Sequence, residues 1–440
     1  MNTFIKRLAV FSAAAVCLLA LAACGEAETE TCESHTWDGG ALTEEADCGN
    51  PGVMTYTCTV CGETKTEPYG EGTGEHSFSD GVCTVCGYVD MSGIGEEEAI
   101  ETYGYWHDDA DGSGTVNTGD YISFGAYPRD EVTDSAVLSA LNALLDESAW
   151  TSYGYSVENE ESDFMCWQDA EYDGETYRAV YATENRPYFT DLTSDYSFVS
   201  SNGYPAGTVY WFEYAPLSWR VLDYADGEAL LNTADCIDSR SFADTYTKDG
   251  SDFLNADGSY SNDWAGSAIR EWLNGDFYGT AFTAAQQTMI AEQTLDNSTT
   301  GYSTTNSYSA VQSDTEDSVY LLSYQDMLNE RYGFPEVETG NVTGNGDGNL
   351  AVCKSGTDYA LAQGIRTSST TTNANGDPCS WWLLRSPGNK SFAVCGITKY
   401  GTITKANTLS YSAGQTSESD GIAFCTSEGI SPAVTVRIGK

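Results

Sequence analysis

A cysteine-rich segment near the N-terminus constrains the fold of this chain more than any other feature. The pattern Cys-Thr-Val-Cys-Gly at 58–62 recurs at 83–87, and two thiolates separated by two residues can bind one zinc ion. The glycine after each pair permits the tight turn of a zinc knuckle. Segment 32–90 is therefore predicted to form two small β-rich, zinc-ribbon-like modules. Its eight candidate ligands, enough for two tetrahedral sites, are Cys32, His35, Cys48, Cys58, Cys61, His76, Cys83 and Cys86.

Two ligand sets fit the first zinc site. The favoured set joins the pair at 58–61 to Cys32 and His35, which have the spacing Cys-x-x-His. The other set joins the same pair to His35 and Cys48. Every candidate is needed to close the site, so the zinc would be structural, with no coordination position left for a substrate water.

The second site would combine His76 with the pair at 83–86, and Cys48 as the fourth ligand, although Cys48 belongs to the other repeat. Disulfides and redox chemistry are the alternatives, since exported cysteines often pair. A Cys-x-x-Cys disulfide closes too short a loop to stabilise much by chain entropy, whereas a metal can fold so small a segment outright. No thioredoxin-like strand and helix surround either pair. The accompanying histidines favour zinc.

The N-terminal sequence is typical of a secretory signal peptide. Lys6 and Arg7 precede an apolar run at 8–20 and the sequence Leu-Ala-Ala-Cys that ends at Cys24. The run is shorter than the roughly 20 residues of a transmembrane helix, so it indicates a cleavable signal. The motif resembles the lipobox of bacterial lipoproteins, in which the cysteine is acylated and becomes the N-terminus. A plain secreted protein is the alternative.

This resemblance implies a location and a layout. Residues 1–23 would be the lipoprotein signal peptide, and 24–31 an acidic tether. The lipid would hold the chain on the extracellular side of the cell membrane. The knuckle repeats are also similar to short repeats of surface proteins in Gram-positive anaerobes.

Charge limits the partners. The chain has 66 acidic and 19 basic residues and a net charge of -47, which argues against nucleic acid as a ligand. It has three histidines, and none follows His107. Ser-His-Asp and Cys-His triads and histidine-ligated metallohydrolases are therefore excluded from the rest of the chain. Carboxylate chemistry of the glycosidase kind stays open, because spacing along the sequence selects no pair.

An Asp- and Gly-rich stretch at 109–120 overlaps the predicted linker 91–115. It resembles a calcium loop of the EF-hand or dockerin kind. Position 12 of the loop is Asp instead of a bidentate Glu, and the next residues alternate like a strand, so a plain turn is favoured over calcium. The candidate ligands are Asp109, Asp111, Ser113, Thr115, Asn117 and Asp120.

From about residue 116 to the end, short strand patterns alternate with polar turns. One stretch, 265–282, has apolar residues at helical spacing. These patterns predict a large strand-rich α+β domain over 116–440. The segment 130–205 is less regular and reads as an insertion. Strands are expected at 209–212, 219–222, 229–232, 319–323 and 392–395.

An ordered set of motifs adds a more specific resemblance. It includes Leu-Ser-Trp-Arg-Val-Leu at 217–222, Ala-Ile-Arg-Glu-Trp-Leu-Asn at 268–274 and Trp-Trp-Leu-Leu-Arg-Ser-Pro-Gly at 381–388. Together with Tyr-Ile-Ser-Phe-Gly-Ala-Tyr-Pro at 121–128, they resemble an uncharacterised domain family of exported bacterial proteins. The resemblance implies a fold related to C-type lectins and to the formylglycine-generating enzyme. The chain departs from the pattern at Leu384, which is inserted, and at 429–433, where Gly-Ile-Ser-Pro-Ala replaces Gly-Val-Arg-Pro-Ala.

We interpret the basic and aromatic residues of these motifs as mainly structural. The tryptophans are predicted to be core residues. Arg220, Arg270 and Arg385 are predicted to pair with carboxylates or carbonyls near the core, and an anion-binding cluster is the alternative. A formylglycine-generating-enzyme-like activity would need two nearby thiols, for which Cys395 and Cys425 are the candidates; inert buried cysteines or a disulfide are favoured.

We therefore expect a non-catalytic binding or adhesion module. Its ligand would be an extracellular protein or glycan, and the polar segment 386–433 is the expected surface. An extracellular enzyme that uses carboxylates is the alternative.

Overall fold

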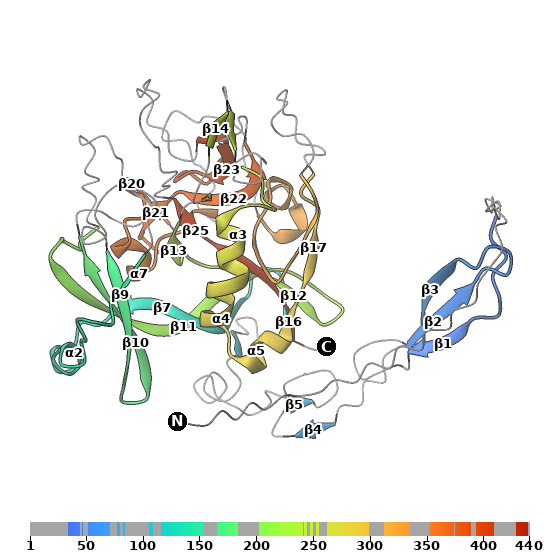
Figure 1. Ribbon diagram of the computed structural model, residues 1–440, viewed down its shortest axis with the longest axis horizontal. Coiled ribbons are helices and arrows are strands. Elements are labelled where there is room, and N and C mark those ends of the chain that lie inside the picture. Colours follow the sequence, from blue (N-terminus) through green and yellow to red (C-terminus); the bar gives the residue numbers. More distant parts are fainter. Residues whose placement is uncertain are drawn as a thin grey trace, which may run out of the picture. The chain divides into compact units, whose positions relative to one another are not determined.

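The computed structural model divides the chain into two compact units, 1–73 and 74–440 (Figure 1). Each is described by itself. The structure describes residues 34–44, 46, 52–70, 77–79, 82–83, 105–108, 116–153, 165–183, 202–240, 242–243, 247–249, 252–254, 262–298, 312–334, 352–373, 375–388, 393–408 and 428–438.

The N-terminal unit is a three-stranded antiparallel sheet. Its order is β1 (Ala41–Glu44), β2 (Gly52–Thr57) and β3 (Thr64–Tyr69). Among the residues described here, only Gly52 and Cys58 are buried. So small a sheet with so little core needs a further source of stability.

The large unit is organised by one long strand, β11 (Thr208–Ala225), in a ten-stranded sheet. β7 (Tyr121–Glu131) pairs along one edge of β11. On the other edge, β10 (Glu175–Ala182) pairs with the first part of β11, and β12 (Glu228–Thr233) pairs with the last. The change of partner falls around Pro216, which has no N–H to donate. The two strands expected at 209–212 and 219–222 are therefore one strand.

The sheet continues on both sides of this centre. β9 (Cys166–Tyr172) and β8 (Thr151–Ser152) follow β10, so the expectation that 130–205 is an insertion was wrong. On the other side, β26 (Pro432–Arg437) pairs with β12, β16 (Ile290–Ala291) and β19 (Val319–Leu321). β6 (Tyr105–Asp108) pairs with β7, so the sheet begins inside the predicted linker.

A second, five-stranded sheet has the order β13-β25-β22-β23-β24. Its strands are β13 (Asp238–Ser239), β25 (Gly429–Ile430), β22 (Trp382–Pro387), β23 (Ala393–Ile397) and β24 (Ile403–Thr408). Four short hairpins complete the strands: β4 (Phe78–Ser79) with β5 (Val82–Cys83), β14 (Thr247–Asp249) with β15 (Asp252–Leu254), β17 (Gln293–Leu295) with β18 (Thr315–Asp317), and β20 (Thr367–Thr372) with β21 (Pro378–Ser380).

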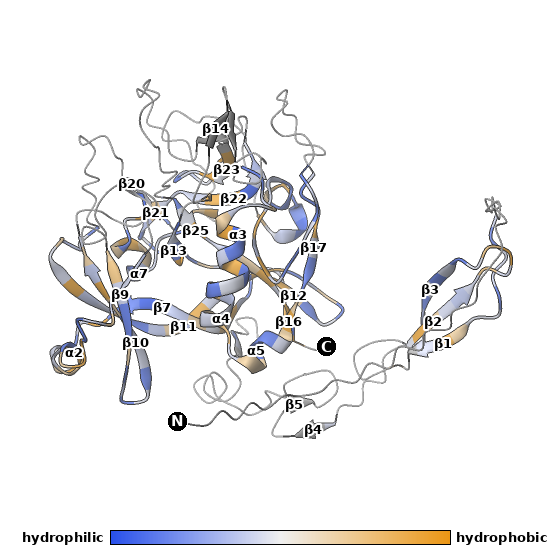
Figure 2. Ribbon diagram, viewed as in Figure 1, coloured by the Kyte–Doolittle hydropathy of each residue, from blue (hydrophilic) through white to orange (hydrophobic). Residues whose placement is uncertain are grey.

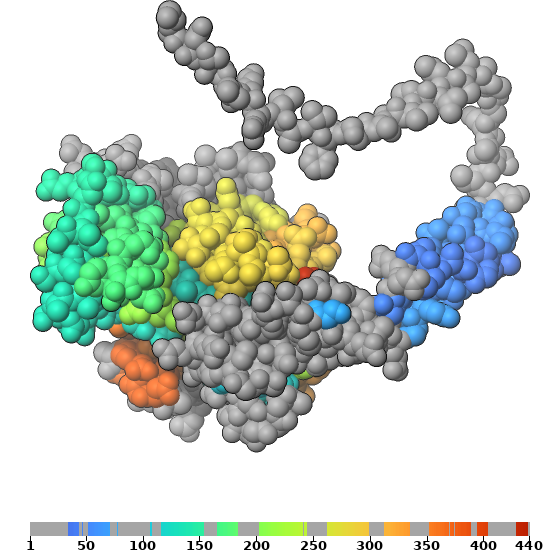
Figure 3. Space-filling view, turned by 90° about the horizontal axis from the view of Figure 1, so that it is seen from below, coloured from blue at the N-terminus to red at the C-terminus, as the bar shows by residue number. Residues whose placement is uncertain are grey.

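The predicted helix at 265–282 is present. It runs through α3 (Ala268–Trp272), a π-helical turn (Leu273–Phe277) and α4 (Tyr278–Ala281), and α5 (Ala284–Met289) follows. Its apolar side faces the core, as the orange residues of Figure 2 indicate, and its polar side reaches the surface, yellow in Figure 3. The other helices are α2 (Ser135–Asn142), α6 (Tyr324–Met327), α7 (Asp358–Ala362) and a 3-10 turn (Glu330–Tyr332).

Gly125 lets this helix approach β7. Its φ is 70°, and a Cβ there would lie 2.7 Å from the Ala281 carbonyl oxygen and from the Phe282 ring. An L side chain is excluded on both counts. The glycine of the motif at 121–128 thus has a packing role. The large unit as a whole is a strand-rich α+β structure, as predicted.

A buried lysine joins the two sheets. The Lys354 ammonium donates hydrogen bonds to Asn232 Oδ1, to the Thr233 carbonyl and to Ser431 Oγ, and it lies 4.8 Å from the centre of the Trp382 ring. Burial lowers the pKa of Lys354 to about 7, although nearby Cys236 and Asp235 act in the opposite direction.

We expect Lys354 to make stability rise between pH 7 and pH 9. In this window the unfolded lysine keeps its proton while the folded one has lost it, so raising the pH favours folding by at most about 1.4 kcal/mol per pH unit. Chemical denaturation of the wild type and of Lys354→Met at pH 7, 8 and 9 measures this. Subtracting the variant removes the opposite effect of buried thiols such as Cys236. Equal slopes in both proteins would mean that the folded lysine stays charged.

Candidate functional site

The structure brings three predicted zinc ligands together in the N-terminal unit. The donor atoms of His35, Cys58 and Cys61 all lie within 4.8 Å of one another, and Cys61 Sγ is 3.4 Å from His35 Nδ1. The two cysteines lie in the turn between β2 and β3. Gly62 closes this turn with a φ of 78° and donates its N–H to the Cys58 carbonyl oxygen at 2.9 Å. The repeated glycine is therefore required by the turn.

The knuckle turn suits a metal-bound thiolate. The N–H of Cys61 is the main cause that lowers the pKa of Cys58, to about 5, and the N–H of Val60 and the His35 ring act in the same direction. His35 Nε2 lies 3.5 Å from the Glu63 carboxylate, which can orient the ring so that Nδ1 faces the sulfurs. The cluster could hold a metal ion, and a tetrahedral zinc site would take three of its four ligands from it.

Most of the other predicted zinc ligands lie outside the described residues. These are Cys32, Cys48, His76 and Cys86. Only the backbone of Cys83 is described, in β5. The choice between Cys32 and Cys48 as the fourth ligand of the first site, and the second site as a whole, stay predictions.

The structure describes only the end of the predicted calcium loop. Asp109, Asp111, Ser113 and Thr115 lie outside the described residues. Asp120 Oδ2 accepts from the Asn117 N–H at 2.7 Å and lies 3.0 Å from His107 Nε2. Asp120, at position 12 of the predicted loop, thus already accepts a hydrogen bond within a turn and contacts His107. Strand β7 starts directly after it. Calcium binding stays a prediction.

The large unit contains a cavity of about 430 Å³ beside β12 and β26 of the main sheet, β17 and α6. The described residues that line it combine acidic, aromatic and hydroxyl groups with one arginine, and they include no histidine, cysteine or lysine. The side chains with chemical functions include Asp223, Glu228, Asp296, Asp326, Tyr320, Tyr324, Tyr332, Ser323, Ser386 and Arg385.

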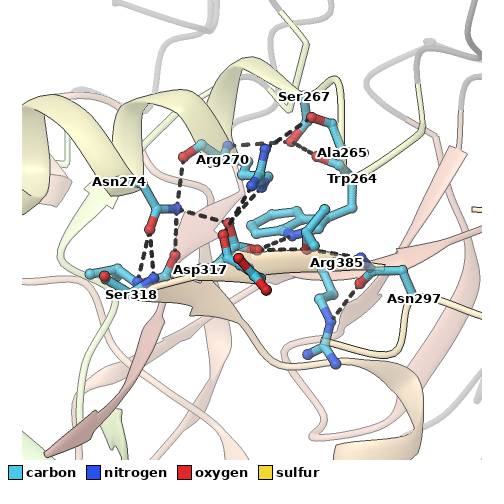
Figure 4. A network of polar contacts seen from close by, with 12 residues as sticks. Trp264, Ala265, Ser267, Arg270, Asn274, Asn297, Asp317, Ser318 and Arg385 are labelled. Carbon is cyan, nitrogen blue, oxygen red and sulfur yellow. Dashed lines mark hydrogen bonds and ion pairs between the residues drawn. The ribbon is translucent and has the colours of Figure 1, made fainter. Parts of the chain in front are cut away.

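Arg385 is held rigidly in the wall of this cavity. It is 6% exposed, and its Nη1 donates at 2.8 Å both to the Leu321 carbonyl oxygen and to Asp326 Oδ2. Its Nε donates to Asn297 Oδ1 at 3.1 Å, as Figure 4 shows. Asp326 also accepts from the Ser323 N–H at 2.7 Å in the capping box of α6. Arginine, carboxylate and helix start therefore form one preorganised unit.

Four carboxyl groups line the cavity. Ser298, through its hydroxyl and its N–H, lowers the pKa of Asp296. Asp223 is 3.0 Å from Arg331, and Glu228 is 3.4 Å from Arg437, but both arginines are largely exposed, so solvent screens these pairs. The cavity is thus acidic, with one fixed guanidinium.

The other two predicted arginines lie outside the lining. Arg220 donates to the carbonyl oxygens of Tyr332 and Gly333 at 2.9 and 3.2 Å, and so supports the turn that carries the cavity tyrosine. Arg270 donates to buried Asp317 at 2.6 Å (Figure 4). The three arginines therefore do not converge on one cleft. Each binds carboxylates or carbonyls, as the motif reading predicts.

The thiols proposed for a formylglycine-generating-enzyme-like activity do not define a site. Cys395 is fully buried and donates to the Pro387 carbonyl oxygen at 3.5 Å. Cys425 lies outside the described residues. Cys24 and the leader lie outside them too. Among the residues that the structure describes, no helix is long and apolar enough to cross a membrane.

Comparison with known proteins supports the C-terminal part of the sequence interpretation. Residues 227–438 match the model of a family described as a domain of unknown function, DUF6273. No curated protein and no solved structure matches the chain. The chain therefore carries an uncharacterised C-terminal domain of this family. The match begins at the turn between β11 and β12, so strands β6 to β11 precede it although they belong to the same sheet.

Proposed function

We propose that this protein is a cell-surface lipoprotein, anchored through Cys24, whose large unit is a non-catalytic module that binds a glycan in the cavity at Arg385. The lipobox-like leader supports the location. The cluster of His35, Cys58 and Cys61 supports a structural zinc site in the stalk between anchor and module. The motifs at 217–222 and 381–388 support the likeness to C-type lectins.

The observation that carries the binding proposal is the chemistry of the cavity. Its carboxyl groups can accept hydrogen bonds from hydroxyl or ammonium groups, and Arg385 sits in a fixed position where it can donate. Three tyrosines add rings and hydroxyls. A ligand dense in hydroxyl groups, with or without amino groups, matches this lining. An anionic polymer does not, because three other carboxylates would repel it.

The same lining argues against hydrolysis. A glycosidase needs one carboxyl group with a raised pKa as general acid. Here Asp326 is bound by Arg385 and Ser323, and its neighbour Asp296 has a lowered pKa. Asp326 is thus already held by two donors, and the lowered pKa of Asp296 favours its charged form, which suits recognition of a ligand.

A glycan array probed with residues 25–440 tests the proposal. We expect Asp296→Asn to weaken binding of the best ligand about 10-fold, because a charged acceptor of the cavity becomes neutral while the cap on Ser298 survives. Glu316→Gln makes the same charge change on exposed β18, outside the lining, and should bind like the wild type. Equal loss in both variants would place recognition elsewhere, and turnover of array hits would favour the enzyme alternative.

A further inference from the structure

Cys353 and Cys379 form a pair of neighbouring thiols outside both sites described above. Cys353 lies before α7 and Cys379 lies in β21, and they are 7% and 0% exposed. The two segments are directly bonded, because the Ser380 N–H donates to the Lys354 carbonyl oxygen at 2.7 Å. The residue after each cysteine thus touches the other segment.

The two thiols lie close enough to shift each other's pKa, and Cys353 Sγ donates to the Lys399 carbonyl oxygen at 3.1 Å. Ser355 Oγ donates to the Pro378 carbonyl oxygen at 3.3 Å and holds the same segments together from the other side. Both thiols are free in the structure.

We propose that Cys353 and Cys379 form a disulfide bond when the protein folds in an oxidising compartment. One thiolate attacks a sulfur of an exchangeable disulfide, such as oxidised glutathione or the disulfide of a thiol oxidoreductase, and releases one thiol. The second cysteine then attacks the mixed disulfide and releases the other thiol. The two cysteines lose two protons and two electrons, and the oxidant's S–S bond takes up both.

Burial limits when the bond can form. Because both side chains are buried in the folded unit, the bond forms before this part of the core closes. It would close the loop 353–379, which carries α7 and β20, and stabilise it mainly by constraining the unfolded chain.

Competition among thiols is limited. Cys395 donates to the Pro387 carbonyl oxygen at 3.5 Å. Cys236 is fully buried, and the charge of nearby Cys379 contributes to the raised pKa of Cys236. Cys236 is therefore the main competitor of Cys353 for bonding to Cys379. Formation of this disulfide in the cell rests on the proposed export of the chain. Oxidation of the protein in a glutathione redox buffer does not depend on export, so the disulfide proposal and the export proposal can be contradicted separately.

Peptide mapping of the full chain tests the bond. Protein refolded in oxidised and reduced glutathione is acid-quenched, alkylated and digested, and we expect one cross-linked peptide joining Cys353 to Cys379, 2 Da lighter than the sum of its thiol peptides. Protein made in a bacterial periplasm should contain the same peptide. If the periplasmic protein lacks it and the refolded protein has it, the bond stands and export of this chain as an oxidised protein is contradicted.

Variants supply the controls. Cys353→Ser should abolish the cross-linked peptide and leave Cys379 alkylated, while Cys395→Ser should keep it. Reduction should lower the melting temperature of the wild type by several degrees and leave Cys353→Ser unchanged. Alkylation of both cysteines in refolded wild type, or a cross-link from Cys236 to Cys379, would overturn the proposal.

Discussion

Replacing Asp317 by Ala is expected to destabilise the large unit by about 3–5 kcal/mol. The Asp317 side chain is fully buried and accepts hydrogen bonds from Arg270 Nε at 2.6 Å, Trp264 Nε1 at 2.9 Å and Thr315 Oγ1 at 2.7 Å (Figure 4). Its removal would leave the buried Trp264 indole N–H without its acceptor and would take the carboxylate partner from the partly buried Arg270 guanidinium. Urea unfolding monitored by tryptophan fluorescence measures the loss.

The adjacent Glu316 provides the control, because it is exposed on the same strand and Glu316→Ala should change stability by less than about 0.5 kcal/mol. A double variant, Arg270→Met with Asp317→Leu, should recover part of the loss, since it leaves no unpaired charge. A loss below about 1 kcal/mol for Asp317→Ala would show that water reaches Arg270 and that this network does not organise the core.

Removing zinc is expected to unfold the N-terminal sheet and leave the large unit folded. The sheet has almost no buried side chains, whereas a structural zinc contributes about 10–16 kcal/mol of binding free energy. Hydrogen–deuterium exchange of the full chain with and without chelator should show loss of protection over 41–69 alone. Metal analysis of the same samples gives the zinc content.

Variants of the cysteines separate ligand loss from general damage. Cys58→Ser should lower the zinc content by one ion per chain and reproduce the exchange of the chelated protein. Cys166→Ser changes a half-buried cysteine of β9, outside the cluster, and should keep the metal. Unchanged protection over 41–69 in metal-free protein would contradict a structural role for zinc.

Local sequence patterns predicted the elements that one segment forms alone. The helix at 268–281 has Ile269, Trp272, Leu273 and Phe277 on one face, and all four are buried. The knuckle turn needs two thiols and one glycine within five residues, so its chemistry is visible in the linear sequence. Each of these signals depends on close neighbours in the chain.

Features that need partners far along the chain were not predictable. The pattern at 209–225 looks like two strands because β11 changes partner around Pro216. The position where the family pattern has arginine is Ser431 here, and its hydroxyl accepts a hydrogen bond from Lys354, which lies in another segment. Contacts between segments this far apart in the chain leave no mark in either local motif.

The cavity is the clearest case of this limit. Arg385 is a candidate because it stands in a motif, but Asp223 lies in β11, Asp296 follows β17 and Asp326 lies in α6, so no single motif contains these three carboxyl groups. In a chain with 66 acidic residues, spacing does not distinguish these carboxylates from exposed ones. The expected strand 319–323 and the motif at 381–388, which contains Ser386, also reach the cavity, but each predicts only a strand.

Calorimetric titration of the best array ligand into residues 25–440 tests glycan binding in the cavity most directly. We predict one binding site per chain, a heat signal that Asp296→Asn weakens about 10-fold in affinity, and an unchanged signal in Glu316→Gln. Binding of the same affinity in the wild type and Asp296→Asn, or no heat with any glycan retained on the array, would contradict it.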